Sequence, residues 1–210
     1  MPTRHRAQDV LAFWFGPRPW TLQSVQRRFA LWFGDPSRPE LTPQVDEAIR
    51  ARYGTLTTAA AGGEFEAWES SPRRRLALIL LLDQFPRSIH RGSAEAFATD
   101  PRALALSITG LQLGADAVLD PVERIFFYMP LQHAESLEVQ EESVAAFRRL
   151  REEAGPELKG LFDGVCRYAE QHRDIVGQFG RFPHRNAALR RESTPDERAW
   201  LAAGGTRFGQ

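Results

Sequence analysis

Prolines that directly follow a helix-capping residue are the feature that most constrains how this chain folds. Proline is favoured at the first position of a helix, because the N–H group that it lacks would have no partner there. Ser, Thr and Asp are favoured just before that position. The chain has five such pairs, which are Thr42-Pro43, Ser71-Pro72, Asp100-Pro101, Asp120-Pro121 and Thr194-Pro195. Helices are therefore predicted to begin near residues 43, 72, 101, 121 and 195. A glutamate three residues after Asp120 and after Thr194 completes a capping box at both sites.

Apolar residues recur at helical spacing in four further segments, which are 7–15, 22–33, 136–153 and 156–179. No segment alternates polar and apolar residues between hairpin turns, so strands are not expected. The sequence predicts an all-α chain of about eight or nine helices without a sheet. Because the links are short, neighbouring helices should run antiparallel, as an array of helix pairs. We expect a single domain over residues 1–210.

Composition argues against several classes of function. Lys+Arg and Asp+Glu number 27 each, so the formal net charge is zero, whereas nucleic-acid-binding proteins usually carry a basic excess. No apolar run approaches the ~18 residues that cross a bilayer. The short apolar run near the N-terminus is broken by Gly16 and Pro17 and does not fit a signal peptide. We therefore expect a cytoplasmic protein that binds neither nucleic acid nor membrane. The single cysteine, Cys166, lies in an apolar stretch and is expected to be a buried structural thiol.

Three polar residues lie on helical faces that should turn toward the core. Asp83 lies four residues after Ile79, His133 lies four after Met129, and His172 lies on the apolar face of its own helix. Burying such groups is costly unless each finds a partner. These residues are therefore expected to take part in a polar network or a pocket.

Asp83 opens the stretch DQFPRSIHR (83–91), which follows seven apolar residues. Pro86 is expected to end this helix, which would place Asp83 near a C-terminus whose partial negative charge repels a carboxylate. We therefore predict that Asp83 pairs with Arg87 or with an arginine of the similar stretch GRFPHRN (180–186), the latter being favoured. Pro130 is likewise expected to kink or end the helix that begins at 121.

We hypothesise that the two aromatic-Pro-basic stretches and the buried polar residues share one pocket. The candidate ligand-binding residues are Asp83, Gln84, Arg87, Arg91, His133, Glu135, His172, Arg181, His184, Arg185 and Asn186. The candidate catalytic residues are His133, His172 and Asp83. Nearly all the positive charge is arginine, Lys159 being the only lysine, which suits planar anions. An Arg-rich, high-GC genome is the alternative explanation of this bias.

No metal or cofactor is expected. The glutamates of segment 133–143 lack the repeated Glu-x-x-His spacing of a carboxylate-bridged metal site and favour a solvated acidic face. The chain has no glycine-rich phosphate loop and no HExxH or GxSxG motif.

Several segments resemble a known bacterial family, the one catalogued as domain of unknown function 924. They are LALILLLDQFPRSIHRG with AFATD, FFYMPLQHAESLEVQE, HRDIVGQFGRFPHRNAALRRESTPDERAWL and the opening VLAFWFG. The resemblance covers nearly the whole chain. It implies a single all-α domain similar to tetratricopeptide-repeat folds. It implies no established activity, so no catalytic residue is carried over from it.

Three functions remain open from the sequence. The first is a helical scaffold that binds an anionic ligand or a peptide in a groove lined by the DQFPR and GRFPHRN loops. The second is a small-molecule enzyme in which His133 or His172 is a general base oriented by Asp83, with arginines holding an anionic substrate. The third is a buried polar network that only fixes helix packing. An open groove favours the first, and a closed pocket favours the second. The oligomeric state is not predicted.

Overall fold

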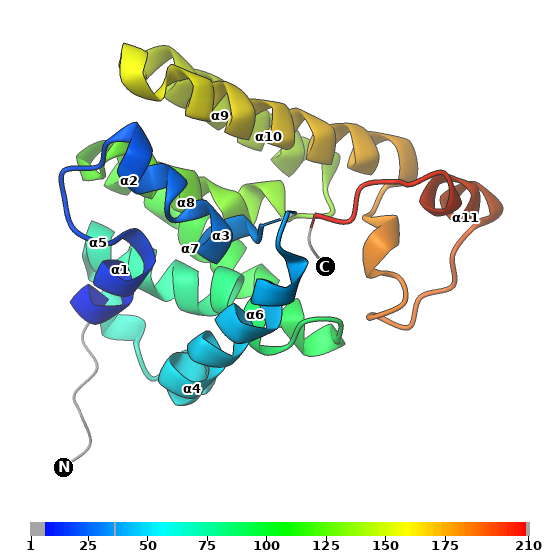
Figure 1. The fold of residues 1–210 in the computed structure, drawn as a ribbon, viewed down its shortest axis with the longest axis horizontal. Helices are drawn as coiled ribbons and strands as arrows, with labels where there is room; N and C mark the ends of the chain where they lie inside the picture. The colour runs from blue at the N-terminus through cyan, green and yellow to red at the C-terminus, as the bar shows by residue number, and fades with distance from the viewer. Residues whose placement is uncertain (1–6, 36, 209–210) are drawn as a thin grey trace.

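The computed structural model describes residues 7–35 and 37–208, and these residues form helices and no strand (Figure 1). The all-α prediction is therefore confirmed. The helices are α1 (Ala7–Phe15), α2 (Leu22–Gln26), α3 (Phe29–Phe33), α4 (Thr42–Ala61), α5 (Pro72–Ile79), α6 (Phe85–Ile89), α7 (Asp100–Gln112), α8 (Pro121–Gln132), α9 (Leu137–Glu153), α10 (Lys159–Phe179) and α11 (Pro195–Ala202).

All five helices that the proline pairs predict begin within one residue of the expected position, namely α4, α5, α7, α8 and α11. Both capping boxes form: Glu123 bonds back to the N–H of Asp120, and Glu197 to that of Thr194. These starts could be predicted because the proline and its capping residue act within one turn.

Segment 22–33 is two short helices, α2 and α3, so the prediction of one helix there is wrong. The physical reason is the way this segment is held on α1. Arg28 Nη1 donates to the carbonyl of Phe13 (3.1 Å) and Trp32 Nε1 to that of Trp14 (3.0 Å). A turn between the helices lets Val25 and Trp32 both be buried.

The helix that starts at Pro72 does not end at Pro86, contrary to the prediction. It continues through a π-helical turn, Leu80–Gln84, into α6. The N–H of Phe85 donates to the carbonyl of Leu80, five residues earlier, and Pro86 lies in the first turn of α6. In a regular α-helix the proline ring would clash with the carbonyl four residues before it. The wider π-turn avoids that clash.

Side chains bind two of the carbonyl groups of this π-turn. Thr99 Oγ1 donates to the carbonyl of Leu82 (2.5 Å). This carbonyl lies four residues before Pro86, which has no N–H to donate to it. Arg87 Nη1 donates to the carbonyl of Asp83 (2.6 Å). Asp83 therefore lies within a continuous helical segment, and the prediction that it lies near a helix C-terminus is wrong.

Pro130 lies inside α8, which runs on to Gln132, so this proline does not end its helix. The end of α8 is held instead from α9. Gln140 Nε2 donates to the carbonyls of Gln132 and Ala134, both at 2.7 Å. These contacts fix the backbone on both sides of His133.

Consecutive helices pack against one another, α10 on α9, α9 on α8 and α8 on α7. Figure 1 shows α9 and α10 as a long antiparallel pair above α7 and α8. α5 contacts α1, α7 and α8, and α4 contacts α6. Residues 76–82 are all fully buried, so α5 and its π-turn form the centre of the core. Cys166 is buried as predicted. Within the described ranges, no helix is long and apolar enough to cross a membrane.

The segment after α10 packs as a smaller unit against that helix. Ile175 and Val176 of α10 and Phe182 form a second apolar cluster, on which Trp200 and Phe208 pack. In Figure 1 the chain after α11 runs back toward the main group of helices. This course places Phe208 on the imidazole ring of His172, with ring centres 3.6 Å apart.

Candidate functional site

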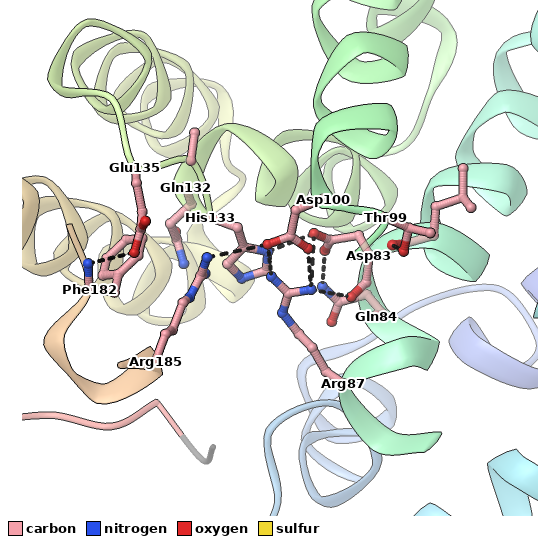
Figure 2. A network of polar contacts seen from close by, with 12 residues as sticks. Asp83, Gln84, Arg87, Thr99, Asp100, Gln132, His133, Glu135, Phe182 and Arg185 are labelled. Atoms are coloured by element: carbon pink, nitrogen blue, oxygen red, sulfur yellow. Dashed lines mark hydrogen bonds and ion pairs between the residues drawn. The ribbon is translucent and has the colours of Figure 1, made fainter. Parts of the chain in front are cut away.

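Asp83 is fully buried, and its carboxylate is held by three side chains. His133 Nδ1 lies 2.8 Å from Oδ1, Arg87 Nη1 lies 3.6 Å from Oδ1, and the Gln84 amide donates to Oδ2 (Figure 2). Burial alone would raise the pKa of Asp83, but His133 and Arg87 outweigh it and hold that pKa well below its usual value. Asp83 is therefore ionised.

The predicted partner of Asp83 is confirmed in part. Arg87 pairs with it, whereas the favoured GRFPHRN stretch does not supply the partner. Arg185 contacts Asp100 instead (3.3 Å), and Arg181 pairs with Glu197 (2.7 Å). The reason is the π-turn, which directs Asp83 toward the end of α8 rather than toward residues 180–186.

His133 is fixed in one tautomer by Asp83. A carboxylate only accepts, so Nδ1 must carry the proton in this 2.8 Å bond, which leaves Nε2 with its lone pair in the neutral ring. Burial, and next the charge of Arg87, lower the pKa of His133, and they outweigh the opposing effect of Asp83. Near neutral pH, His133 is therefore an uncharged base.

His172 has the same tautomer by a different contact. Its Nδ1 lies 2.7 Å from the carbonyl of Tyr168, which can only accept, so Nε2 again keeps its lone pair. The ring lies 6.2 Å from that of His133, centre to centre. Burial, and next the proximity of His133, hold the pKa of His172 well below its usual value. The two candidate histidines thus lie together, as the enzyme hypothesis requires.

Asp100, the first residue of α7, joins two arginines. It accepts two hydrogen bonds from Arg87 (2.9 and 3.0 Å) and one from Arg185 Nη1 (3.3 Å), as Figure 2 shows. In the sequence, Asp100 stands out only as a helix-capping residue. Its place in the AFATD segment of the family resemblance is the signal that could have identified it.

Arg185 is the least satisfied charged group of this site. Its guanidinium lies between the rings of Phe97 (4.7 Å) and Phe182 (4.5 Å), and only 6% of the residue is exposed. Its Nε has no acceptor among the residues that the structure describes. Burial, and next the charge of Arg87, lower its pKa to about 10, so it remains a cation at neutral pH.

The other basic residues of the two stretches have different surroundings. Arg91 forms a two-pronged ion pair with Asp46 (2.7 and 2.9 Å). His184 Nδ1 is buried without a hydrogen-bond partner in the described part of the chain. Burial, and next Arg185, lower the pKa of His184 to about 3, so this ring is neutral as well.

Three candidate residues hold the GRFPHRN stretch in place. Glu135 accepts from the N–H of Phe182 (2.8 Å), and Glu197 accepts from both Arg181 (2.7 Å) and Asn186 (3.1 Å). None of Glu135, Arg181 and Asn186 contributes to the pocket described next, so they position the loop rather than face a ligand.

A pocket of about 890 Å³ lies beside these groups. Seven of the candidate residues line it, which are Gln84, Arg87, Arg91, His133, His172, His184 and Arg185. Asp83 lies behind His133, outside the wall. The rest of the wall is largely apolar and was not predicted; it includes Trp14, Phe29, Trp32, Phe33, Phe97, Met129, Phe147, Leu161, Val165 and Phe208. The pocket therefore combines charged and polar groups with a large aromatic and aliphatic surface.

Gly160 and Gly164 of α10 leave room in this wall. A Cβ at Gly160 would meet nothing within 4 Å, and one at Gly164 would meet only the tip of Arg167, 4.0 Å away. Leu22 and Phe33, also wall residues, are 40% and 46% exposed and lie where the pocket meets solvent. Over residues 7–35 and 37–208, no group of three or more His, Cys, Asp and Glu side chains is placed to hold a metal ion.

Comparison with known proteins gives a family without an assigned activity. No curated protein sequence matches the chain. The structure of ATU0120 from Agrobacterium tumefaciens, a protein of unknown function, is similar with a TM-score of 0.76 at 35% sequence identity. That similarity covers 94% of this chain and 97% of the other. Residues 10–205 match the family described as bacterial protein of unknown function (DUF924), which confirms the resemblance seen in the sequence. The chain therefore belongs to the DUF924 family of bacterial proteins.

Proposed function

We propose that this protein binds a small organic acid, with the carboxylate at Arg185 and Arg87 and the apolar body along the aromatic wall of the pocket. The observation that carries the proposal is the buried Arg185 guanidinium on the pocket wall, whose Nε has no acceptor among the described residues. An unpaired buried donor on a cation is costly, and a bound carboxylate would satisfy it.

The local charges favour a singly charged ligand. Arg87 and Arg185 face Asp83 and Asp100, so two positive charges meet two negative ones. The nearby histidines, whose pKa values are all lowered, add no charge near neutral pH. A dianion such as a phosphate monoester would leave more negative charge uncompensated in a buried site than a carboxylate does.

The wall favours an apolar body over a peptide. Aromatic and aliphatic side chains line much of it, and its volume of about 890 Å³ lies within the range of small-molecule sites. A peptide, the other kind of ligand that the sequence leaves open, carries an N–H and a C=O group in almost every residue. The aromatic and aliphatic part of the wall offers these groups no hydrogen-bond partners.

A purely structural network, the third possibility, explains less of the site. The carboxylates of Asp83 and Asp100 accept hydrogen bonds from within the protein. Arg185 Nε and His184 Nδ1, in contrast, have no partner in the described ranges, and both residues line the pocket. A network that served only packing would be expected to satisfy its own buried polar atoms.

Calorimetric titration with acetate, octanoate, decanoate and octyl phosphate tests the proposal. We expect affinity to rise from acetate to decanoate, because longer chains bury more apolar surface, and octyl phosphate to bind more weakly than decanoate. Arg185→Gln should weaken decanoate binding by roughly 10- to 100-fold, on the scale of one charge-assisted hydrogen bond. Arg149→Gln, at an exposed arginine of α9 outside the pocket, is the matched control.

Two results would contradict the proposal. One is the absence of binding by every acid to a correctly folded protein. The other is decanoate binding that Arg185→Gln leaves unchanged, which would place the acid elsewhere. Circular dichroism of both variants shows whether the substitution has altered the fold.

A further inference from the structure

Acid binding does not use the Asp83–His133 pair. Two arginines would hold a carboxylate without any need for a histidine with a fixed tautomer. We propose that the protein hydrolyses esters of apolar organic acids, with His133 as the general base that activates a water molecule. This inference rests on the proposed function, because the product of such a reaction is the organic acid that the pocket is proposed to bind.

The first observation is the way His133 is anchored. Asp83 is buried, ionised and held in turn by Arg87 and Gln84, so its hydrogen bond fixes both the proton and the orientation of the ring. His133 is also a wall residue of the pocket, and its Nε2 forms no hydrogen bond with a described residue. A base oriented by a carboxylate, with its other nitrogen unpaired, is what proton transfer from a bound water requires.

The second observation is His172. It lines the same pocket, its Nε2 also keeps a lone pair, and its ring centre lies 6.2 Å from that of His133. This separation is short enough for one water molecule to lie between the rings and donate a hydrogen bond to each nitrogen. His172 is therefore assigned as a positioning residue that orients the attacking water.

The third observation is the position of the arginines. Arg87 and Arg185 line the pocket together with His133, and the Asp83 carboxylate contacts both Arg87 and His133. Cationic N–H donors beside the base stabilise the negative charge that develops on a carbonyl oxygen under attack. The same donors then hold the product carboxylate.

The reaction balances with water as the only co-substrate. The water oxygen bonds to the ester carbonyl carbon while one of its protons moves to His133 Nε2. The tetrahedral oxyanion forms beside the guanidinium groups. It then collapses, the bond from carbon to the alcohol oxygen breaks, and the departing oxygen takes the proton from His133. The acid releases its proton to solvent and remains as a carboxylate.

Hydrolysis of p-nitrophenyl octanoate and p-nitrophenyl acetate by the full chain tests this inference. We expect the octanoate ester to be cleaved with the higher kcat/KM. His133→Gln should lower kcat by roughly 10²- to 10⁴-fold, the range for loss of a general base, while octanoate still binds. His90→Gln is the matched control, since His90 is exposed at the end of α6 and any exposed imidazole cleaves activated esters slowly. Its kcat should equal that of the unaltered protein.

Asp83→Asn tests the positioning role of the carboxylate. We expect kcat to fall with little change in KM, because the substituted amide can present a donor to Nδ1 and stabilise the wrong tautomer. Should either variant fail to fold, the unaltered protein still decides the question through product inhibition. Octanoate should inhibit ester cleavage competitively, with an inhibition constant equal to its calorimetric Kd.

The outcomes separate the inference from the function on which it rests. Octanoate that binds while both esters are cleaved no faster than in buffer overturns the hydrolase and leaves acid binding standing. A cleavage rate that His133→Gln does not reduce, or that octanoate does not inhibit, also overturns it. Octanoate that does not bind at all removes the proposed function itself.

Discussion

His133 Nδ1 lies 2.8 Å from Asp83 Oδ1, across 50 positions of sequence, and this contact joins the centre of the core to the pocket wall. The Asp83–His133 contact depends on two local features of the fold. A π-helical turn places Asp83 within a buried helical segment, and Gln140 holds the backbone on both sides of His133. Both residues of the pair are therefore held in place by their surroundings, as expected for a site that must keep its geometry.

Asp83→Ala should lower the free energy of unfolding by about 3–5 kcal/mol, the usual range when one member of a buried ion pair is removed. The substitution leaves Arg87 and the N–H of His133 without their acceptor. Urea denaturation measures the change, with Asp174→Ala as the control, because Asp174 is exposed on α10. A stability equal to that of the unaltered protein would show that Asp83 is not a structural partner.

Thr99→Val should lower the free energy of unfolding by about 1–3 kcal/mol, because the carbonyl of Leu82 loses its hydrogen bond in a buried site. Pro86→Ala supplies an N–H group in the turn that follows this carbonyl. We therefore expect Thr99→Val to be milder in the Pro86→Ala background. Urea denaturation of both single variants and the double variant measures this coupling. Strictly additive effects would contradict the role that we assign to Thr99 at the π-turn.

Gly164→Leu should raise the free energy of unfolding by about 0.5–1 kcal/mol, since glycine weakens a helix interior. The same substitution should weaken decanoate binding more than acetate binding. The new side chain meets no atom closer than 4.0 Å from its Cβ and extends into the pocket. Gly177→Leu, on an exposed part of the same helix, should stabilise without this loss. Equal effects of the two variants on decanoate would place the apolar body of the ligand away from α10.

Stability should decline as the pH falls from about 6.5, which is the ordinary histidine pKa. Burial holds the pKa of His184 at about 3 and that of His172 well below its usual value. Below about pH 6.5, the unfolded chain therefore binds protons that the folded chain excludes, and each such histidine removes up to about 1.4 kcal/mol per pH unit. The loss of stability due to each histidine is complete once the pH falls below the pKa of that histidine in the folded chain.

Urea denaturation between about pH 7.5 and about pH 5 measures this slope. His184→Gln should make it shallower, with His90→Gln as the control for an exposed histidine. A pH-independent stability over this range would mean that the buried rings are accessible to protons in the folded chain.

The sequence identified the local features of this protein better than the distant ones. Helix starts at prolines such as Pro121 and Pro195 could be predicted because proline and its capping residue act within a turn. The course of the chain at Pro86 could not, because a π-turn depends on side chains from elsewhere, such as Thr99. The spacing of apolar residues along this segment gives no sign that a π-turn interrupts the α-helix.

In the candidate site, too, single residues could be predicted from local patterns, whereas contacts between distant segments could not. His133, His172 and Arg185 could be recognised as polar groups near apolar stripes or in the FP stretches, and they do lie on one pocket wall. Asp100 was missed because its two arginines come from α6 and from the 180–186 stretch. Phe208 was missed because only the course of the chain after α11 brings it onto His172.

A crystal structure of the protein with bound decanoate tests the central claim most directly. We predict the carboxylate within hydrogen-bond distance of Arg185 and the carbon chain along the wall that includes Trp32 and Gly164. Decanoate bound with its carboxylate away from Arg185, or bound only outside this pocket, would contradict the claim.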